Sequence, residues 1–277
     1  MAIGLLCIAG AVPHTRAPAG YAQLQHQFAA LDYSLASVRA GGGVPRLFLR
    51  ELPPDLGGEV SSNERKLTFL RAMLPLILSE NEKILADRRR LQKLAQRQRI
   101  KGQLGAADYD WVIRIAERYA LPDFNPPGGE WKQLLARVDV APVSLALAQA
   151  AVESGWGTSR FARQGNALFG QQTWKAGAGM APLQRNSGAG HKVRSFDRLS
   201  ESVSAYLRNL NTHGHYDRLR ARRAELRQAG KTPGGFELAR YLDRYSSNGE
   251  KYVSDLRQVM RNNALRQLDD ARLHPGV

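Results

Sequence analysis

One segment of the 277-residue chain, residues 142–170, constrains the fold more than any other. It reads PVSLALAQAAVESGWGTSRFARQGNALFG. Residues 143–153 are rich in Ala and Leu, which favour helix, and the Pro before them is tolerated at a helix start. The glycines of the following Ser-Gly-Trp-Gly sequence predict that the helix ends there. The sequence therefore predicts an apolar helix that carries one carboxylate, Glu153, at its C-terminal end.

Glu153 occupies the helix end at which a carboxylate is disfavoured, because the last carbonyl groups carry partial negative charge. On one interpretation it is a solvated residue at a helix terminus. On the other, the dipole, apolar neighbours such as Ala150 and Trp156, and burial keep the carboxyl protonated near neutral pH, ready to act as a general acid. We favour the second. Gln149 lies one turn earlier on the same helical face, where it would hydrogen-bond this carboxyl or a bound sugar.

Residues 146–170, ALAQAAVESGWGTSRFARQGNALFG, resemble the signature of the bacterial glucosaminidase domain. This is glycoside hydrolase family 73, which includes the flagellar peptidoglycan hydrolases, and the resemblance is strongest to its Bax-like members. It extends from about residue 44 to the C-terminus. In the family the Glu of the ESGWG segment is the catalytic acid, which implies this role for Glu153. A looser match to a second family motif over residues 245–252 implies that Tyr245 is the active-site tyrosine.

The resemblance implies a mainly α (α+β), lysozyme-like fold with a small β-hairpin lobe. Residues 168–174 and 191–196 have the composition of two short strands, separated by a Gly-rich loop over 176–190. Such a lobe facing a helical lobe would form a cleft for a glycan chain. An apolar sugar face packs on aromatic rings, and polar side chains hydrogen-bond its hydroxyls. The candidate substrate-binding residues are therefore Gln149, Trp156, Asn166, Phe169, Tyr206 and Tyr252.

The predicted hairpin segment, residues 171–195, contains no Asp or Glu. A mechanism with two carboxylates needs a nucleophile or base across the scissile bond from the acid. The alternative is substrate assistance, in which the 2-acetamido group of N-acetylglucosamine attacks its own anomeric carbon while Glu153 protonates the leaving oxygen. We favour this route slightly, with Tyr245 orienting the acetamido group or stabilising the positive charge. The remaining candidates for a second carboxylate are Asp197, Glu201, Asp243 and Glu250.

The chain divides by composition into a short apolar start, an Ala-, Gly- and Pro-rich stretch, and two folded parts. The apolar start is shorter than the ~20 residues that span a bilayer and resembles the central region of a signal peptide. We expect four regions: a signal peptide or membrane anchor over 1–19, a flexible linker over 20–43, a helical extension packing on the catalytic domain over 44–138, and the glucosaminidase domain over 139–277.

Within the extension, Ser61 and Glu64 have capping-box spacing ahead of leucines at helical spacing. They predict a long helix or a helical pair, kinked near Pro75. Its end, residues 88–99, is the most basic run of the chain. This run is either a surface that grips anionic wall polymer or lipid headgroups, or a solvated helix face with a few buried leucines.

Forty Lys and Arg against 25 Asp and Glu leave a net charge of +15, which predicts anionic surroundings or an anionic partner. We expect no nucleic acid, because the chain has no zinc-finger or RNA-binding aromatic signature. The single cysteine, Cys7, excludes an internal disulfide. His213 and His215 lack further ligands at metal-binding spacing, so we predict neither a metal nor a cofactor. The sequence predicts no particular oligomeric state.

Together these features predict an exported peptidoglycan hydrolase of the periplasm or cell envelope, with an N-terminal membrane anchor as the alternative to a cleaved signal peptide. It would be an endo-β-N-acetylglucosaminidase that cleaves β-1,4 links of the glycan strands. One alternative is a lytic transglycosylase, which uses a single acid and makes a 1,6-anhydro product. Another is a wall-binding or morphogenetic module without turnover. A chitin-like polymer of N-acetylglucosamine is also compatible with the sequence.

Overall fold

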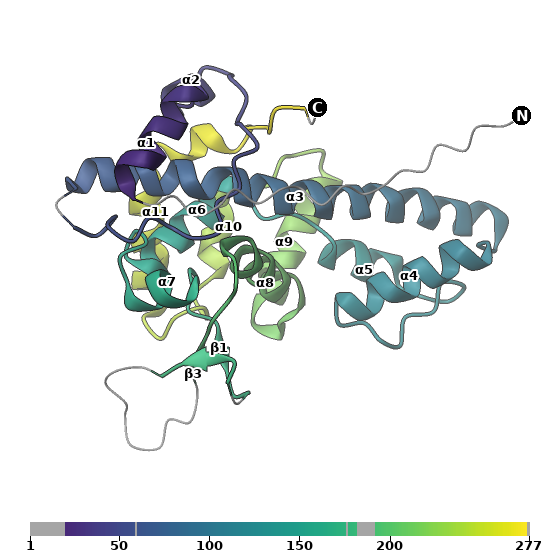
Figure 1. Ribbon diagram of the computed structural model, residues 1–277. Coiled ribbons are helices and arrows are strands. Elements are labelled where there is room, and N and C mark those ends of the chain that lie inside the picture. Colours follow the sequence, from purple (N-terminus) through teal and green to yellow (C-terminus); the bar gives the residue numbers. More distant parts are fainter. Residues whose placement is uncertain (1–19, 59, 176, 182–191, 276–277) are drawn as a thin grey trace, which may run out of the picture.

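The computed structural model describes residues 20–58, 60–175, 177–181 and 192–275 (Figure 1). The fold is mainly helical with one small antiparallel sheet, which confirms the predicted mainly α (α+β) class. The α-helices are α1 (Tyr21–Ala30), α2 (Leu35–Arg39), α3 (Ser62–Lys101), α4 (Ala106–Arg118), α5 (Trp131–Arg137), α6 (Val143–Ser154), α7 (Arg160–Gly165), α8 (Leu199–Thr212), α9 (Asp217–Gln228), α10 (Gly235–Leu238) and α11 (Gly249–Asn262). Short 3-10 helices follow at η1 (Gly214–Tyr216), η2 (Ala239–Tyr241) and η3 (Leu265–Leu268).

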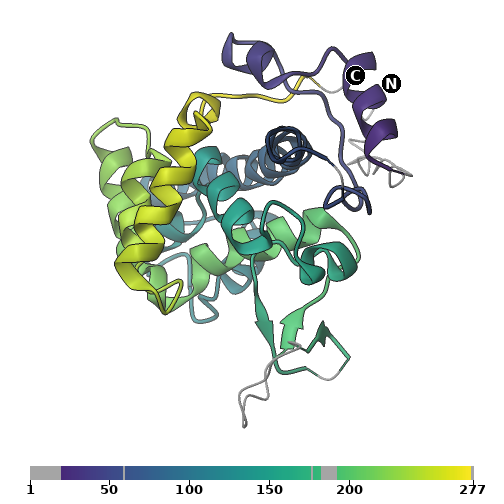
Figure 2. The same ribbon diagram turned by 90° about the vertical axis from the view of Figure 1, so that its left-hand side faces the viewer.

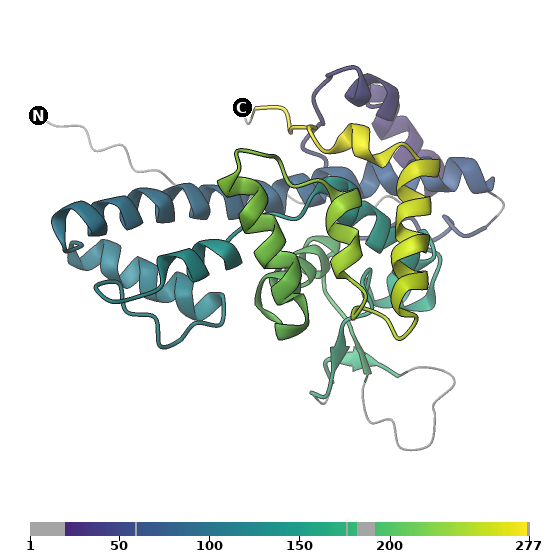
Figure 3. The ribbon, with the colours of Figure 1, turned by 180° about the vertical axis from the view of Figure 1, so that it is seen from behind.

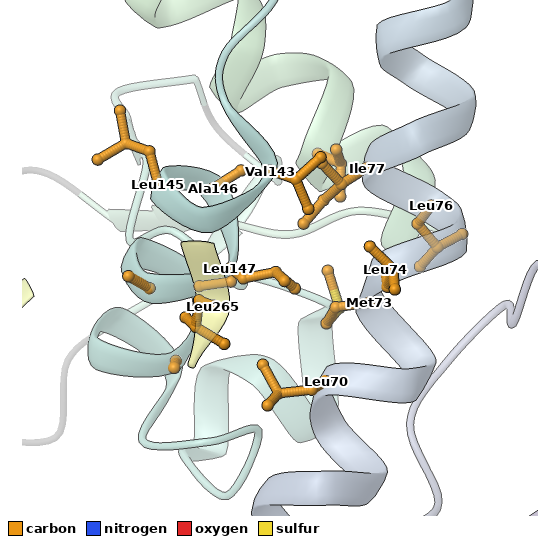
Figure 4. Close-up of a cluster of buried hydrophobic side chains, with 14 of the residues drawn as sticks. Leu70, Met73, Leu74, Leu76, Ile77, Val143, Leu145, Ala146, Leu147 and Leu265 are labelled. Carbon is orange, nitrogen blue, oxygen red and sulfur yellow. The ribbon is translucent and has the colours of Figure 1, made fainter. Parts of the chain in front are cut away.

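Helix α6 forms the centre of the molecule, packed against α3, α8, α10, α11 and η3. Ten of the twelve residues of α6 are buried, and only Val152 and Glu153 at its C-terminal end are partly exposed, so neighbouring helices cover most of its surface. Leu147 points toward Met73 and Leu74 of α3 (Figure 4). Gly155 ends the helix in the left-handed conformation with a φ of 58°, which a glycine adopts without steric cost. The predicted helix and its predicted stop are both confirmed.

Helix α3 runs unbroken for 40 residues, so a single helix replaces the helical pair that was one of the predictions. Half of the predicted capping box is present at its start: Ser61 Oγ accepts from the amide of Glu64, and the Glu64 carboxylate accepts from the Ser61 hydroxyl instead of from its amide. Pro75 lies inside the helix and has no amide hydrogen for the carbonyl group of Arg71. The hydroxyl of Tyr33 donates to that carbonyl oxygen at 3.1 Å instead. A separate segment therefore compensates for the proline.

Residues 20–43 are not a flexible linker, and this prediction is wrong. They form α1 and α2, which lie along the first half of α3 (Figures 1 and 2). Leu24 and Phe28 of α1 and Val38 of α2 are buried in the main core. The guanidinium of Arg71 lies 4.2 Å from the Phe28 ring centre. The glycines and alanines suggested a tether, but enough apolar residues at helical spacing remain to bury a face of each helix.

The second half of α3 extends away from the main body and packs with α4 and α5 around a smaller hydrophobic cluster (Figure 3). Leu91, Leu94, Val112, Ile115 and Leu134 are at its centre. Because α3 contributes its first half to the main core and its second half to this cluster, one helix joins the two bodies. None of the described helices is both long enough and apolar enough to cross a membrane.

A buried ion cluster fixes this extension to the main body. Asp139, which is almost fully buried, accepts two hydrogen bonds from Arg227 at 2.7 and 2.8 Å and lies 3.6 Å from Arg88 and 3.7 Å from Arg223. Burial alone would raise the pKa of Asp139, but these arginines outweigh it and lower that pKa. Arg88, predicted as part of a basic surface, therefore has a structural role inside the protein.

The small sheet projects from the main body below α7 and α8 (Figure 2). Strand β1 (Gln172–Thr173) pairs with β3 (Lys192–Arg194), which confirms the predicted hairpin, although both strands are shorter than expected. Strand β2 (Gly179–Met180) arises within the predicted loop and pairs with the other edge of β3, so the order is β1-β3-β2. The rest of that loop, residues 182–191, and the predicted signal or anchor region, residues 1–19, lie outside the described residues.

The Tyr33 hydroxyl bonds the carbonyl group that Pro75 leaves without a donor, and this bond leads to a prediction about stability. Tyr33→Phe should lower the free energy of unfolding by about 1–2 kcal/mol, because it leaves the Arg71 carbonyl without a donor in a buried place. Urea unfolding measures the change. Tyr109→Phe is the matched control, since its hydroxyl bonds Asn125 at the surface and its loss should cost under about 0.5 kcal/mol.

A double-mutant cycle isolates the role of the proline. Pro75→Ala restores an amide hydrogen for the carbonyl group of Arg71, so Tyr33→Phe should cost less in that background than in the wild type. Equal costs in the two backgrounds would show that the tyrosine does not compensate for the proline.

Candidate active site

Glu153, on the last turn of α6, lines a hollow of about 710 Å³. The walls of the hollow come from the segment after α7, the start of the small sheet, α8, η1 and residues 244–246. Gly170 faces the carboxyl: its φ is 62°, and a Cβ there would lie 3.5 Å from Glu153 Oε2. Glycine is thus favoured by the backbone conformation and keeps the approach to the carboxyl open.

Behind the carboxyl, a buried chain of hydrogen bonds joins three helices. Tyr206 of α8 donates to Gln149 Oε1 at 2.7 Å, and Gln149 Nε2 donates to the hydroxyl oxygen of Tyr252 of α11 at 3.0 Å. An amide NH₂ group only donates, so the Tyr252 oxygen accepts there and its own hydrogen is left for another acceptor. That acceptor is Glu153, to which Tyr252 is hydrogen-bonded.

Two opposing effects set the protonation of Glu153. Burial raises the pKa of its carboxyl, because the charged form loses hydration, and the hydrogen bond from Tyr252 lowers it in part. Burial is the larger effect, so the pKa of Glu153 lies above its ordinary value. A carboxyl of this kind retains its proton at higher pH than a solvated glutamate and is suited to donate it.

Aromatic rings form the walls around Glu153. Tyr245 donates its hydroxyl to the carbonyl oxygen of Phe169 at 2.9 Å, and its ring stacks on that of Tyr252 with centres 5.5 Å apart. The Phe169 ring stacks on Tyr206 at 4.0 Å. Burial raises the pKa of Tyr245 well above its ordinary value, so its hydroxyl stays neutral. These contacts pack aromatic rings against one another beside the carboxyl.

The structure brings together part of the predicted site. Glu153, Phe169 and Tyr245 line the hollow, and Tyr252 reaches it through its hydrogen bond to Glu153. The carboxyl lies at a cavity with aromatic neighbours, so the interpretation of Glu153 as a solvated helix-end residue does not hold.

Four of the predicted sugar contacts are placed elsewhere. Gln149 and Tyr206 are completely buried and bond each other, so neither side chain faces the hollow. Trp156 packs edge-on against Phe69 of α3, 6.0 Å between ring centres. Asn166 is buried and donates to the Phe196 carbonyl oxygen at 3.1 Å. None of these four residues is in the lining of the hollow. Polar and aromatic residues also satisfy and fill a helical core, and residue type alone does not separate the two uses.

Sequence reasoning missed four residues that line the hollow: Trp174, Arg194, Arg208 and Arg244. The side chain of Trp174 is 75% exposed, an unusual state for a tryptophan. A tryptophan in an otherwise polar segment could have been recognised in the sequence as a candidate ligand-binding residue. The arginines come from β3, α8 and the segment after η2, and nothing in the sequence distinguishes them among forty basic residues. None of the three forms an ion pair within the described part of the chain.

Among the described residues that line this hollow, Glu153 alone carries a carboxyl group. Asp243 and Glu250, two of the candidates for a second carboxylate, line a different hollow, and Asp243 pairs with Arg218 at 3.7 Å. Glu201 lines a third hollow and accepts a hydrogen bond from the amide of Asp197. The described geometry therefore offers one acid and no partner carboxylate facing it.

Two histidines also face the hollow. His213 and His215 lie with ring centres 4.5 Å apart, and His213 Nδ1 accepts from the amide of His215. Across the described residues, no group of three or more His, Cys, Asp or Glu side chains is arranged to hold a metal ion.

Comparison with known proteins identifies the class of this fold and site. Residues 128–265 match the family model of the glucosaminidase domain, described as mannosyl-glycoprotein endo-beta-N-acetylglucosaminidase, which places the domain among the glycosidases. The chain is also 37% identical over 211 residues to protein bax of Escherichia coli (strain K12), covering 76% of this chain and 74% of that protein. No solved structure matches significantly. The chain belongs to the Bax-like proteins with a glucosaminidase domain, as the sequence predicted.

The hydrogen bond between Tyr252 and Glu153 generates a prediction about proton affinity. Tyr252→Phe should raise the pKa of Glu153 further, because burial then acts without the bond that stabilises the carboxylate. NMR titration of the ¹³C-labelled glutamate carboxyl measures this pKa. Tyr245→Phe keeps the Tyr252 bond and should shift the pKa less; an unchanged or lower pKa in Tyr252→Phe would contradict the assignment.

Proposed function

We propose that this protein is a peptidoglycan hydrolase, an endo-β-N-acetylglucosaminidase that uses Glu153 as its general acid. The observation that carries the proposal is the environment of that carboxyl. It is the only acid lining an aromatic-walled hollow among the described residues, and burial raises its pKa. A general acid needs this state, since it must hold its proton until the leaving oxygen takes it.

The single carboxyl favours substrate assistance. In this route Glu153 gives its proton to the glycosidic oxygen while the acetamido oxygen of the same sugar bonds to the anomeric carbon and the glycosidic bond breaks. Water then opens the resulting oxazolinium ring, and its proton returns to Glu153. Tyr245, held by the Phe169 carbonyl, presents a fixed neutral ring at this place and would orient the acetamido group.

The arginines of the hollow favour an acidic glycan. Arg194, Arg208 and Arg244 line the same hollow as Glu153, and no carboxylate among the described residues neutralises them. Guanidinium groups bind carboxylates through paired hydrogen bonds. Peptidoglycan carries carboxylates on its stem peptides, and on lactyl groups that lack a stem, whereas chitin carries none, so we place peptidoglycan ahead of chitin as the substrate.

This substrate implies an envelope location. We propose that the protein is exported to the periplasm or cell envelope, with residues 1–19 as signal peptide or anchor. The basic run on α3 is a weaker candidate for contact with an anionic envelope surface than the sequence suggested. Arg88 is partly buried beside Asp139, and Arg90 and Arg97 both pair with Asp108, at 3.0 and 2.7 Å.

Removal of the acid tests the enzyme assignment. Glu153→Gln should lower the turnover of purified cell-wall sacculi by about 10²–10⁴-fold, the usual contribution of a positioned general acid. Mass spectrometry of the released fragments gives both rate and product. Reducing N-acetylglucosamine ends are expected from the wild type, and 1,6-anhydro ends would identify a lytic transglycosylase. A biological effect that survives Glu153→Gln would indicate a wall-binding module instead.

The same substitution should increase stability at neutral pH. Because the pKa of Glu153 is raised in the folded state, its contribution to folding is complete below the unfolded pKa and is lost as pH rises through the folded pKa. Gln carries no charge at any pH, so Glu153→Gln should be more stable than the wild type above that pKa and similar to it at low pH. Thermal unfolding at several pH values checks both the sign and the retained fold.

Charge removal in the hollow tests the choice of substrate. Arg208→Ala should lower kcat/KM on peptidoglycan fragments that carry free carboxylates by roughly 10-fold, the loss of one charged hydrogen bond. The activity on neutral chitin oligosaccharides should change much less. An equal loss of kcat/KM on both substrates would show that Arg208 does not bind a carboxylate of the substrate.

A further inference from the structure

A second hollow, of about 840 Å³, is lined by residues of α9, α10, η2, α11 and the segment between η2 and α11. Helices α9, α10 and α11 lie side by side on one face of the molecule (Figure 3). The second hollow is a neighbour of the Glu153 hollow, because one segment contributes to both. Arg240 and Asp243 line the second hollow, and Arg244, Tyr245 and Ser246 line the first. A polymer that runs out of the first hollow along this segment therefore meets the second.

Arginines form most of the polar lining of the second hollow. Two of them, Arg257 and Arg261, pack on the ring of Phe236 together with the neighbouring Arg266, whereas Arg218 and Arg240 contact the ring of Tyr241. The guanidinium groups of Arg257, Arg261 and Arg266 lie 4.8, 5.6 and 5.6 Å from the ring centre of Phe236. Arg257 also donates through Nε to the Phe236 carbonyl oxygen at 3.1 Å. Ring contacts of this kind hold guanidinium groups in place while their N–H edges stay free to bind.

Positive charge exceeds negative charge in the second hollow, because four arginines and two carboxylates, Asp243 and Glu250, line it. Of the four arginines that line the hollow, only Arg218 pairs with a carboxylate in the described structure, Asp243 at 3.7 Å. Other arginines of α9 do have acidic partners: Arg222 pairs with Glu237 at 2.7 Å, and Arg223 belongs to the buried ion cluster around Asp139. Gathering like charges costs free energy unless an anion neutralises them. The cluster is thus arranged for an anionic ligand.

The surroundings favour an acidic polymer over a bilayer. The exposed large apolar side chains of the described chain are on α1, α3, α4 and the sheet lobe, and none is on α9, α10 or α11. A bilayer would therefore find no apolar anchor on this face. The hollow is also far larger than a single ion needs and offers several separate guanidinium groups.

We infer that the arginine cluster around Phe236 is a secondary binding site for the carboxylates of the acidic wall glycan, next to the Glu153 hollow. This inference rests on the proposed function and adds a site to it. Paired hydrogen bonds from Arg240, Arg257 and Arg261 would hold carboxylates of the polymer beyond the point of cleavage. A short oligosaccharide would be too small to reach the cluster.

Binding to purified sacculi tests the site without cleavage, in the Glu153→Gln background. The double variant Arg240→Ala/Arg261→Ala should bind roughly 2- to 30-fold more weakly, the loss of two exposed charge contacts. Its affinity should also depend less steeply on salt. Both side chains are exposed, and apart from ring contacts with Tyr241 and Phe236 no structural bond depends on them, so the fold should persist. Arg240→Lys/Arg261→Lys keeps the charge but not the planar fork and should recover only part of the affinity.

Arg50→Ala/Arg114→Ala is the matched control, because it removes two exposed arginine charges that lie outside both hollows and outside the basic run of α3. Its binding to sacculi should be unchanged. An equal loss of sacculus binding in the control and test variants would show that only the net charge of the protein matters. No loss in the test variant would show that the second hollow does not bind the wall polymer. Either result overturns the inference.

Two further ligands test the choice of partner. If Arg240→Ala/Arg261→Ala loses binding to vesicles with anionic phospholipid or to duplex DNA while its affinity for sacculi is unchanged, the wall-polymer site is refuted. The cleavage assay with Glu153→Gln tests the proposed function, and the sacculus-binding assay tests the arginine site. Either proposal can therefore be refuted without the other.

Discussion

The buried amide of Gln149 is the interaction on which the site depends. Helix α6 is enclosed by other helices, and a polar side chain in such a place must have both its donor and its acceptor satisfied. Tyr206 of α8 and Tyr252 of α11 meet this requirement from opposite sides. The bonds hold both helices against α6, and they also direct the Tyr252 hydroxyl toward Glu153. Core packing and acid chemistry are thereby linked through one residue.

The net charge of +15 is not distributed evenly over the protein surface, and the arginines fall into groups with different roles. Arg88 and Arg223 hold the buried Asp139 and join the α3–α5 extension to the main body. Removing one partner from such a cluster leaves a buried charge unpaired, which is costly. Other arginines, such as Arg208 and Arg261, line the hollows and form no ion pair within the described part of the chain. Position in the fold, and not composition, separates structural cations from those left for a ligand.

The N-terminal helices show how one local irregularity places a distant segment. Pro75 interrupts the hydrogen-bond ladder of α3, and the Tyr33 hydroxyl fills the gap from outside the helix. Arg71, whose carbonyl group is involved, also stacks on Phe28 and donates to Gln25 at 2.6 Å. A stretch that looks like a tether by composition is therefore a docked part of the fold, held where α3 would otherwise have an unpaired carbonyl group.

Features that depend on neighbouring residues were determined by the sequence alone: the start and end of α6, the capping box of α3, the hairpin and the acid at the helix end. Their physical basis is local, because caps, glycines and helix formers act on the backbone within a few residues. The resemblance supplied the role implied for Glu153. Only the tertiary structure decided that Gln149 and Tyr206 serve the core, that Trp156 packs on α3, and that Arg208 joins two other arginines at the acid. The reason is that a buried amide, a core ring and a ligand-facing guanidinium look alike in sequence until the fold brings their distant partners together.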